Sequence, residues 1–211
     1  MSHMSEQRDE KHGLPLARDL AWQRLHTADL QMLASKCGGH SDLQANTLSI
    51  RYLNLDVEVL IGESRITAQP DGLILMEEVL ILRYLYLCDG TPPSGRWISL
   101  RDLPGGMQYF APFFGRTGRP LAARFGQDAA SFARGSRQLL ADPLSFGDCS
   151  FLYRLLPKLW LGIVLHLGDE EFPPEVTILF DESVRHQFTT EDCVAAAQVL
   201  TRRLLRAATS C

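Results

Sequence analysis

The spacing of apolar side chains predicts a helix near the start of the chain and another at its end. Between residues 14 and 36, apolar residues recur every three or four positions and so share one helical face. They are Ala17, Ala21, Leu25, Ala28 and Met32. Gly38 and Gly39 follow, where a helix C-cap is expected. Residues 189–192, TTED, supply an N-cap and an acidic first turn for the final helix.

The region between residues 47 and 88 predicts a small sheet followed by a buried helix. Residues 47–67 hold β-branched and aliphatic runs that are broken at Asn54 and at residues 62–64, which indicates a three-stranded meander. Residues 73–88, LILMEEVLILRYLYLC, are nearly all apolar, and charged residues interrupt them before they reach membrane length. We expect this segment to be the central helix of the core.

The second half of the chain predicts a long loop, a helix and a group of strands. Residues 89–120 are rich in Pro and Gly, which indicates a loop, and residues 121–140 indicate a helix that ends at Asp142-Pro143. The apolar runs after Asp148 are typical of strands, with a hairpin through residues 169–174.

Helices and strands occur in separate groups along the chain instead of alternating strictly. The sequence therefore predicts a single α+β domain, residues 14–208, with an antiparallel or mixed sheet packed on the apolar helix at 73–88. We expect residues 1–13 to form a disordered N-terminal tail. A division near residue 90, where the Pro/Gly-rich stretch begins, is the alternative.

Composition narrows the classes of partner. The net charge of -4 and a pI near 5.9 provide no general attraction to nucleic acid or to an anionic membrane, so we expect neither as a partner. The five cysteines are scattered, with no two closer than eighteen positions, so no CxxC pair can hold a metal or cluster. Their odd number and the charged first thirty residues lead us to expect a cytoplasmic protein.

The strongest local charge lies in the middle of the chain. The segment from Arg96 to Arg137 contains seven arginines and two aspartates, a local charge of +5. Arginines beside glycine turns can hold an anion, with the backbone N–H groups of Gly105 and Gly106 contributing. Alternatively, the arginines form a solvated face that pairs with the acidic C-terminal third of the chain.

Aromatic residues gather in the same segment. Trp97, Tyr109 and three phenylalanines at 110, 113 and 114 could stack on a planar ligand while Arg101 and Arg116 hold its acid groups. The alternative is that these rings fill the core beneath a long loop. The predicted ligand site consists of Trp97, Arg101, Gly105, Gly106, Tyr109 and Arg116. No particular cofactor is implied.

A second candidate site lies in the acidic segment near residue 170. His166, Asp169 and Glu171, with Asp181 further along, could hold a divalent cation for hydrolysis. The alternative is a charged hairpin turn, because consecutive side chains of an extended segment point to opposite faces. The sequence does not contain the nucleotide-binding motifs GxxxxGK[ST] and GxGxxG or the catalytic serine motif GxSxG. These motifs therefore give no support for nucleotide binding or for serine catalysis.

Four strings carry a resemblance to a known family. They are WISLRDLPGGMQYF (97–110), RPLAARFG (119–126), LGDEEFPPEVTILFD (167–181) and TTED (189–192). The chain resembles, over roughly residues 15–207, a prokaryotic family of domains of unknown function, number 3786. The resemblance implies anaerobic bacterial or archaeal relatives, some fused to cysteine-rich iron–sulfur segments, and an accessory role in anaerobic cofactor or corrinoid metabolism. It implies no catalytic residues.

These observations lead to three functional hypotheses. The first is a non-catalytic binding or accessory protein for an anionic small molecule or cofactor, held by the central segment. The second is a metal-assisted hydrolase that uses the acidic segment. The third is a protein-interaction module whose basic middle docks an acidic partner.

Overall fold

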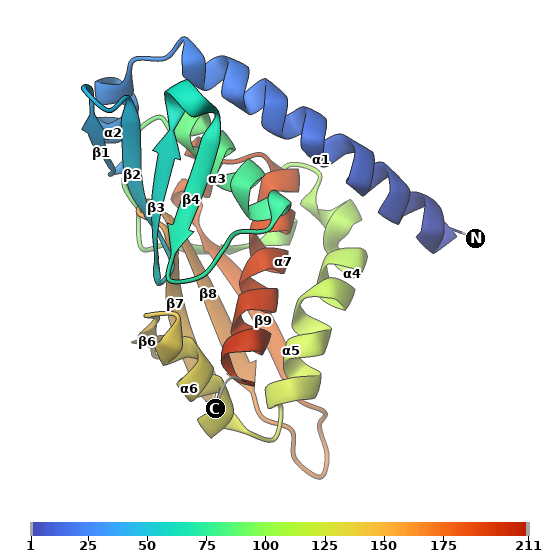
Figure 1. Ribbon diagram of the computed structural model, residues 1–211. Helices are drawn as coiled ribbons and strands as arrows, with labels where there is room; N and C mark the ends of the chain where they lie inside the picture. The colour runs from blue at the N-terminus through green and yellow to red at the C-terminus, as the bar shows by residue number, and fades with distance from the viewer. Residues whose placement is uncertain (1, 210–211) are drawn as a thin grey trace.

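The protein contains two antiparallel sheets, with helices gathered on one side of the larger sheet (Figure 1). The computed structural model describes the backbone of residues 2–209 and the side chains of residues 13–209. The predicted class, a single α+β domain, is confirmed, and the sheets are antiparallel. The tail predicted at residues 1–13 and the domain bounds 14–208 stay predictions.

The smaller sheet has the strand order β1-β2-β3-β4. Its strands are β1 (His40–Asp42), β2 (Thr47–Tyr52), β3 (Leu55–Leu60) and β4 (Arg65–Gln69). The last three form the meander expected from the sequence, while β1 is an additional strand. Alternation along β2 and β3 buries every second residue, which places one face of this sheet against the core.

The larger sheet has the strand order β5-β9-β8-β7-β6. Its strands are β5 (Trp97–Ser99), β6 (Asp142–Leu144), β7 (Cys149–Leu156), β8 (Leu159–His166) and β9 (Glu175–Asp181). The hairpin expected through residues 169–174 joins β8 to β9. The two sheets are linked where Leu53 donates its backbone N–H to the carbonyl of Leu155 at 3.1 Å.

Seven α-helices lie among the described residues. They are α1 (Ser2–His26), α2 (Leu30–Cys37), α3 (Leu75–Leu87), α4 (Gly106–Arg116), α5 (Gly118–Phe125), α6 (Ala129–Gln138) and α7 (Thr190–Ala207). Short 3-10 turns occupy residues 61–63, 100–102 and 182–186. In Figure 1, α7 crosses in front of the larger sheet beside α4 and α5. Among the described residues, none of these helices has the length and apolar content needed to cross a bilayer.

The central helix expected at 73–88 is α3, and it lies inside the core. Its buried residues include Leu80, Ile81, Leu82 and Leu85, and it packs against α1, α2 and α7. One hydrophobic core extends from Ala21 to Ala208 and includes residues of both sheets. This continuity explains why the Pro/Gly-rich stretch near residue 90 does not divide the chain into two domains.

Two helices predicted as continuous are each broken by an aspartate. The helix expected at 14–36 ends at His26, and a new one begins after Asp29, whose carboxylate accepts the Met32 N–H at 3.0 Å. Likewise, the helix expected at 121–140 is divided at Asp128, which accepts the Ser131 N–H at 2.8 Å. Each aspartate satisfies free N–H groups at a helix start and so favours a new helix over continuation.

The expectation of a long loop at 89–120 is wrong for its second half. Helix α4 occupies residues 106–116 although it contains Pro112, and α5 begins at Gly118. The aromatic side of α4 faces the sheet, where Phe113 packs against Phe180 with ring centroids 6.5 Å apart. Gly and Pro residues disfavour a helix here, but burial of the aromatic rings against the sheet stabilises it.

Candidate functional site

The structure does not gather the predicted ligand residues into one site. Trp97 lies on β5 and packs over Gly162 of β8, where a Cβ would sit 3.3 Å from the indole. Arg101 stacks on Phe110, with its guanidinium carbon 3.6 Å from the ring centroid. Tyr109 is 44% exposed on α4, and Arg116 lines a different cleft at the end of that helix.

Arg101 borders a small pocket that suits an anion poorly. The pocket has a volume of about 140 Å³ and lies between α4 and β9. Phe113 and Phe114 form part of its wall, and Phe113 also belongs to the hydrophobic core. Glu175 lines the same pocket, and its carboxylate would repel a negatively charged ligand.

Gly105 and Gly106 shape the start of α4 and leave little for a ligand. Gly105 has φ +71°, a conformation that favours glycine. A Cβ on Gly106 would lie 1.8 Å from the carbonyl oxygen of Leu100, so only glycine fits there. The N–H of Gly106 already donates to the carbonyl of Leu103 at 2.9 Å, so it is not free to bind an anion.

The other arginines of the basic segment also point to separate places. Arg96 pairs with Glu182 at 2.5 Å, and Arg124 lies 3.9 Å from Asp128 and donates to Ser131. The charge of +5 is therefore dispersed over several surfaces, much as the solvated-face alternative describes. Arg116, a member of the same segment, lines a cleft of its own.

That cleft lies between the α4–α5 junction and one face of α7, and its volume is about 680 Å³. The lining residues are Arg116, Pro120, Gln198, Thr201, Arg202, Leu205, Arg206 and Thr209. Three of them are arginines, and among the described residues of the lining none is Asp or Glu. Asp71 lies 3.7 Å from the Arg206 guanidinium and offsets part of this charge.

Arg202 and Arg206 are site residues that sequence reasoning missed. They belong to a stripe on α7 in which residues 198, 201, 202, 205 and 206 recur at helical spacing, and Thr209 continues it just beyond the end of the helix. The spacing of apolar residues from Cys193 to Ala207 predicts only the buried face of α7. Testing the opposite face for clustered arginines would have found this stripe, although its meeting with Arg116 depends on tertiary packing.

The face of α7 next to this stripe forms a buried ionic cluster. Arg203, 7% exposed, donates to both carboxylate oxygens of Glu77 at 2.6 and 2.7 Å and to Asp71 at 2.8 Å. The Tyr52 hydroxyl donates to Glu77 at 3.1 Å. Hydrogen bonds to Glu77 raise the pKa of Arg203, which keeps it charged despite its burial. The cluster ties α7 to α3 and the smaller sheet.

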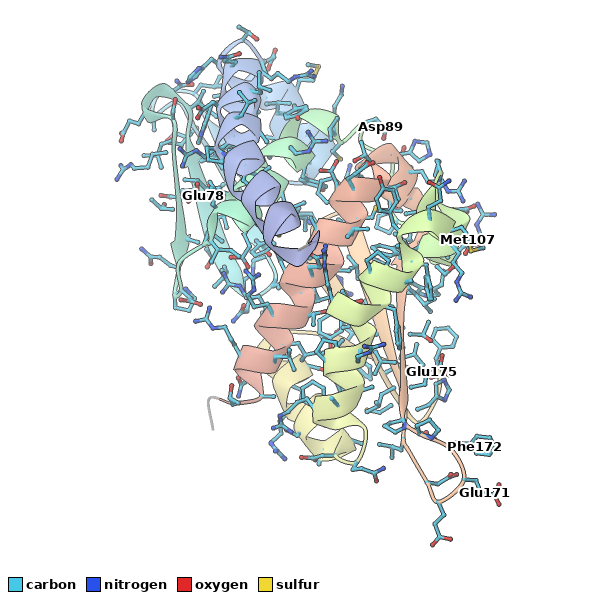
Figure 2. The ribbon with its side chains drawn as sticks, turned by 90° about the vertical axis from the view of Figure 1, so that its right-hand side faces the viewer. Glu78, Asp89, Met107, Glu171, Phe172 and Glu175 are labelled. Atoms are coloured by element: carbon cyan, nitrogen blue, oxygen red, sulfur yellow. The ribbon has the colours of Figure 1, made fainter. Side chains whose placement is uncertain are left out.

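The candidate metal residues do not converge. Asp169 accepts the N–H groups of Glu171 and Phe172 at 2.8 and 2.7 Å, and these bonds hold the pKa of Asp169 below its ordinary value. Figure 2 shows Glu171 and Phe172 at the tip of the β8–β9 loop, pointing away from the body of the protein. His166 is at the end of β8, paired in register with Glu175. Within residues 13–209, no three His, Cys, Asp or Glu side chains are close enough to hold a metal ion.

Asp181, the fourth residue considered for a metal, has a structural role. It is fully buried and accepts the N–H groups of Ser94, Gly95 and Ser183 at 2.9, 2.6 and 2.9 Å. Burial alone would raise the pKa of Asp181, but these hydrogen bonds outweigh it and the pKa is lowered. The carboxylate therefore fixes the segment that leads into β5.

Comparison with known families gives one match. The family described as a domain of unknown function, DUF3786, matches residues 29–203, and the chain belongs to this family. No curated protein and no solved structure matches the chain. The family expected from the four sequence strings is thus confirmed, and it assigns no activity.

Proposed function

We propose that the protein binds a multiply charged anionic small molecule, a phosphate or a polycarboxylate, in the cleft between the α4–α5 junction and α7. The observation that carries this proposal is the presence of Arg116, Arg202 and Arg206 around one cavity of about 680 Å³. Cavities that take small molecules have volumes of roughly 300–1,000 Å³. The proposal retains the anionic ligand expected from the sequence and moves it to a different set of residues.

The chemistry of the lining favours an anion over a neutral ligand. A guanidinium presents a planar fork of N–H donors that matches both carboxylate and phosphate oxygens. Gln198 provides a further polar group, while Pro120 and Leu205 provide apolar contact. Because α7 is anchored by its buried face, the arginines of its open face are carried on a rigid support.

Pyrophosphate and citrate are suitable probes because they represent the two anion classes. At a concentration one hundred times Kd, a ligand that binds only the folded state stabilises it by about 2.7 kcal/mol. We therefore expect at least one probe to raise the melting temperature of the wild-type protein. Loss of a charged hydrogen bond costs about 1.5–3 kcal/mol, so Arg202→Gln should weaken binding measured by calorimetry at least tenfold.

Arg101→Gln is the matched control, because Arg101 is exposed and lies outside the cleft. It should leave the affinity for either probe unchanged. Binding that is equally weakened in Arg101→Gln and Arg202→Gln would place the anion elsewhere. Failure of both probes to stabilise the wild type at low ionic strength would refute the proposal, because screening of the arginines by salt is then least.

A further inference from the structure

Two cysteines that are far apart in the sequence meet inside the fold. Cys37 ends α2 and Cys88 follows α3, and these two helices pack against each other. Each sulfur also contacts the backbone of the other segment. The Cys37 sulfur lies 3.3 Å from the carbonyl oxygen of Leu85, and the Cys88 sulfur lies 3.4 Å from that of Lys36.

Positive charge gathers around this pair. The protein has three lysines, and two of them, Lys36 and Lys158, lie beside the thiols. Lys158 is fixed in place because its ammonium donates to the carbonyl of Gly90 at 2.7 Å, two residues after Cys88. Cationic groups stabilise a thiolate, which is the reactive form of cysteine.

The two thiols are unequal. The hydrogen bond from Cys37 lowers the pKa of Cys88 more than burial raises it, and the Gly90 N–H and the Lys158 charge act in the same direction as that bond. The pKa of Cys37 is raised by the neighbouring Cys88 side chain and by burial. Cys88 is therefore the more acidic thiol, and at 3% exposed against 0% for Cys37 it is also the one nearer to solvent.

The other described cysteines have no such arrangement. Cys193 is buried in α7, and burial and the neighbouring Asp192 raise its pKa. Cys149 on β7 also has a raised pKa, mainly from burial. Neither thiol has a lowered pKa like that of Cys88. Cys149 and Cys193 therefore serve as internal controls for the reactivity of Cys88.

We propose that Cys37 and Cys88 form a redox site that a small peroxide closes to a disulfide and that a dithiol reductant reopens. The Cys88 thiolate attacks one peroxide oxygen, the O–O bond breaks, and Cys88 becomes a sulfenic acid as hydroxide leaves. The Cys37 sulfur then attacks the Cys88 sulfur, the S–O bond breaks, and a second hydroxide leaves. The protons of the two thiols convert both hydroxides to water, so two electrons pass from the thiols to the peroxide.

The burial of the pair selects the size of the oxidant. Cys37 is fully buried and Cys88 is 3% exposed. A peroxide is much smaller than a bulky disulfide, so the slight exposure of Cys88 favours a peroxide as the oxidant. The site is separate from the arginine-lined cleft and does not depend on the function proposed for that cleft.

Treatment of the reduced, full-length protein with hydrogen peroxide tests the proposal. We expect two of the five thiols to be lost together, with a mass decrease of two hydrogens, and dithiothreitol should restore both. Peptide mapping should locate the disulfide between Cys37 and Cys88. Cys37→Ser should stop at a sulfenic acid on Cys88, which dimedone traps, because no resolving thiol remains.

Matched variants keep the test decisive. Cys193→Ser should form the disulfide as the wild type does, and Cys88→Ser should not form it. Lys158→Met should form the disulfide at least tenfold more slowly than the wild type. Circular dichroism verifies the fold of each variant, and the mapping result on the wild type does not depend on any variant. A disulfide between other cysteines, an intermolecular disulfide, or equal oxidation of Cys88→Ser and Cys193→Ser would overturn the proposal.

Discussion

Arg202 and Arg203 are adjacent residues of α7 with opposite surroundings. Arg203 is 7% exposed and is held by Glu77, Asp71 and the carbonyl of Gly72. Arg202 is exposed and lines the large cleft beside Arg116. Successive residues on a helix are separated by about 100°, so one step along the chain moves a guanidinium from the core to the open side.

The difference teaches that residue type does not determine the role of an arginine here. In the core, desolvation makes a guanidinium costly unless hydrogen-bonded carboxylates surround it, and Arg203 has them. On the open side, Arg202 is exposed, so water solvates its charge and no such set of carboxylates is needed. We expect the buried side of α7 to control stability and the open side to control binding.

The largest expected effect is at Arg203. Arg203→Met leaves the Glu77 carboxylate buried without its main partner, and breaking such a pair costs about 3–5 kcal/mol. Urea denaturation measures this loss. Adding Glu77→Gln should recover part of it, because the amide removes the unpaired charge and still accepts from Tyr52. Simple addition of the two single losses would show that the residues do not act as a pair.

A smaller effect is expected at the start of α7. Asp192 accepts from Arg83 at 2.6 and 2.7 Å and from the Thr189 hydroxyl at 2.8 Å. Asp192→Asn weakens both contacts, and because hydrogen bonds to charged groups contribute about 1.5–3 kcal/mol, we expect a loss at the lower end of that range. Thermal unfolding measures it. Glu191→Gln, on the exposed side of the same turn, should change stability by less than about 0.5 kcal/mol.

Measuring stability as a function of pH extends the comparison to Asp181. This carboxylate is buried like that of Glu77, but it accepts hydrogen bonds from neutral N–H groups instead of from a guanidinium. Because its pKa is lowered in the folded state, its contribution to stability is complete above the unfolded value of about 3.9 and is lost as pH falls through the folded value. Asp181→Asn should therefore flatten the acid limb of the stability curve below pH ~4. An unchanged acid limb would mean that other carboxylates cause the transition.

The smallest effect on stability is expected at Arg202. Arg202→Gln should alter the free energy of unfolding by no more than about 0.5 kcal/mol, because the side chain is exposed. The same variant should lose affinity for the anion probe, as described above. If it destabilised the protein as much as Arg203→Met does, both sides of α7 would be structural and the comparison would fail.

Much of the fold followed from local patterns. The apolar run that became α3, the alternation in β2 and β3, and the Thr189 cap of α7 each express a preference carried by neighbouring residues. The breaks at Asp29 and Asp128 were also encoded locally and were overlooked, because an aspartate inside an amphipathic pattern can be either a surface residue or a new N-cap.

The candidate sites were harder to predict because their members come from distant parts of the chain. Arg116 was identified, but its companions Arg202 and Arg206 lie more than eighty residues later, on a helix interpreted only by its apolar face. Cys37 and Cys88 meet because α2 packs against α3. No spacing rule connects such pairs in advance.

The amino-acid sequence by itself determined the class of the fold, the positions of most helices and strands, the family and the excess of arginine in the middle of the chain. Only the tertiary structure decided which charges are buried in pairs and which surround a cavity. The physical reason is that secondary structure depends on neighbouring residues, whereas desolvation and charge pairing depend on what each helix face is packed against.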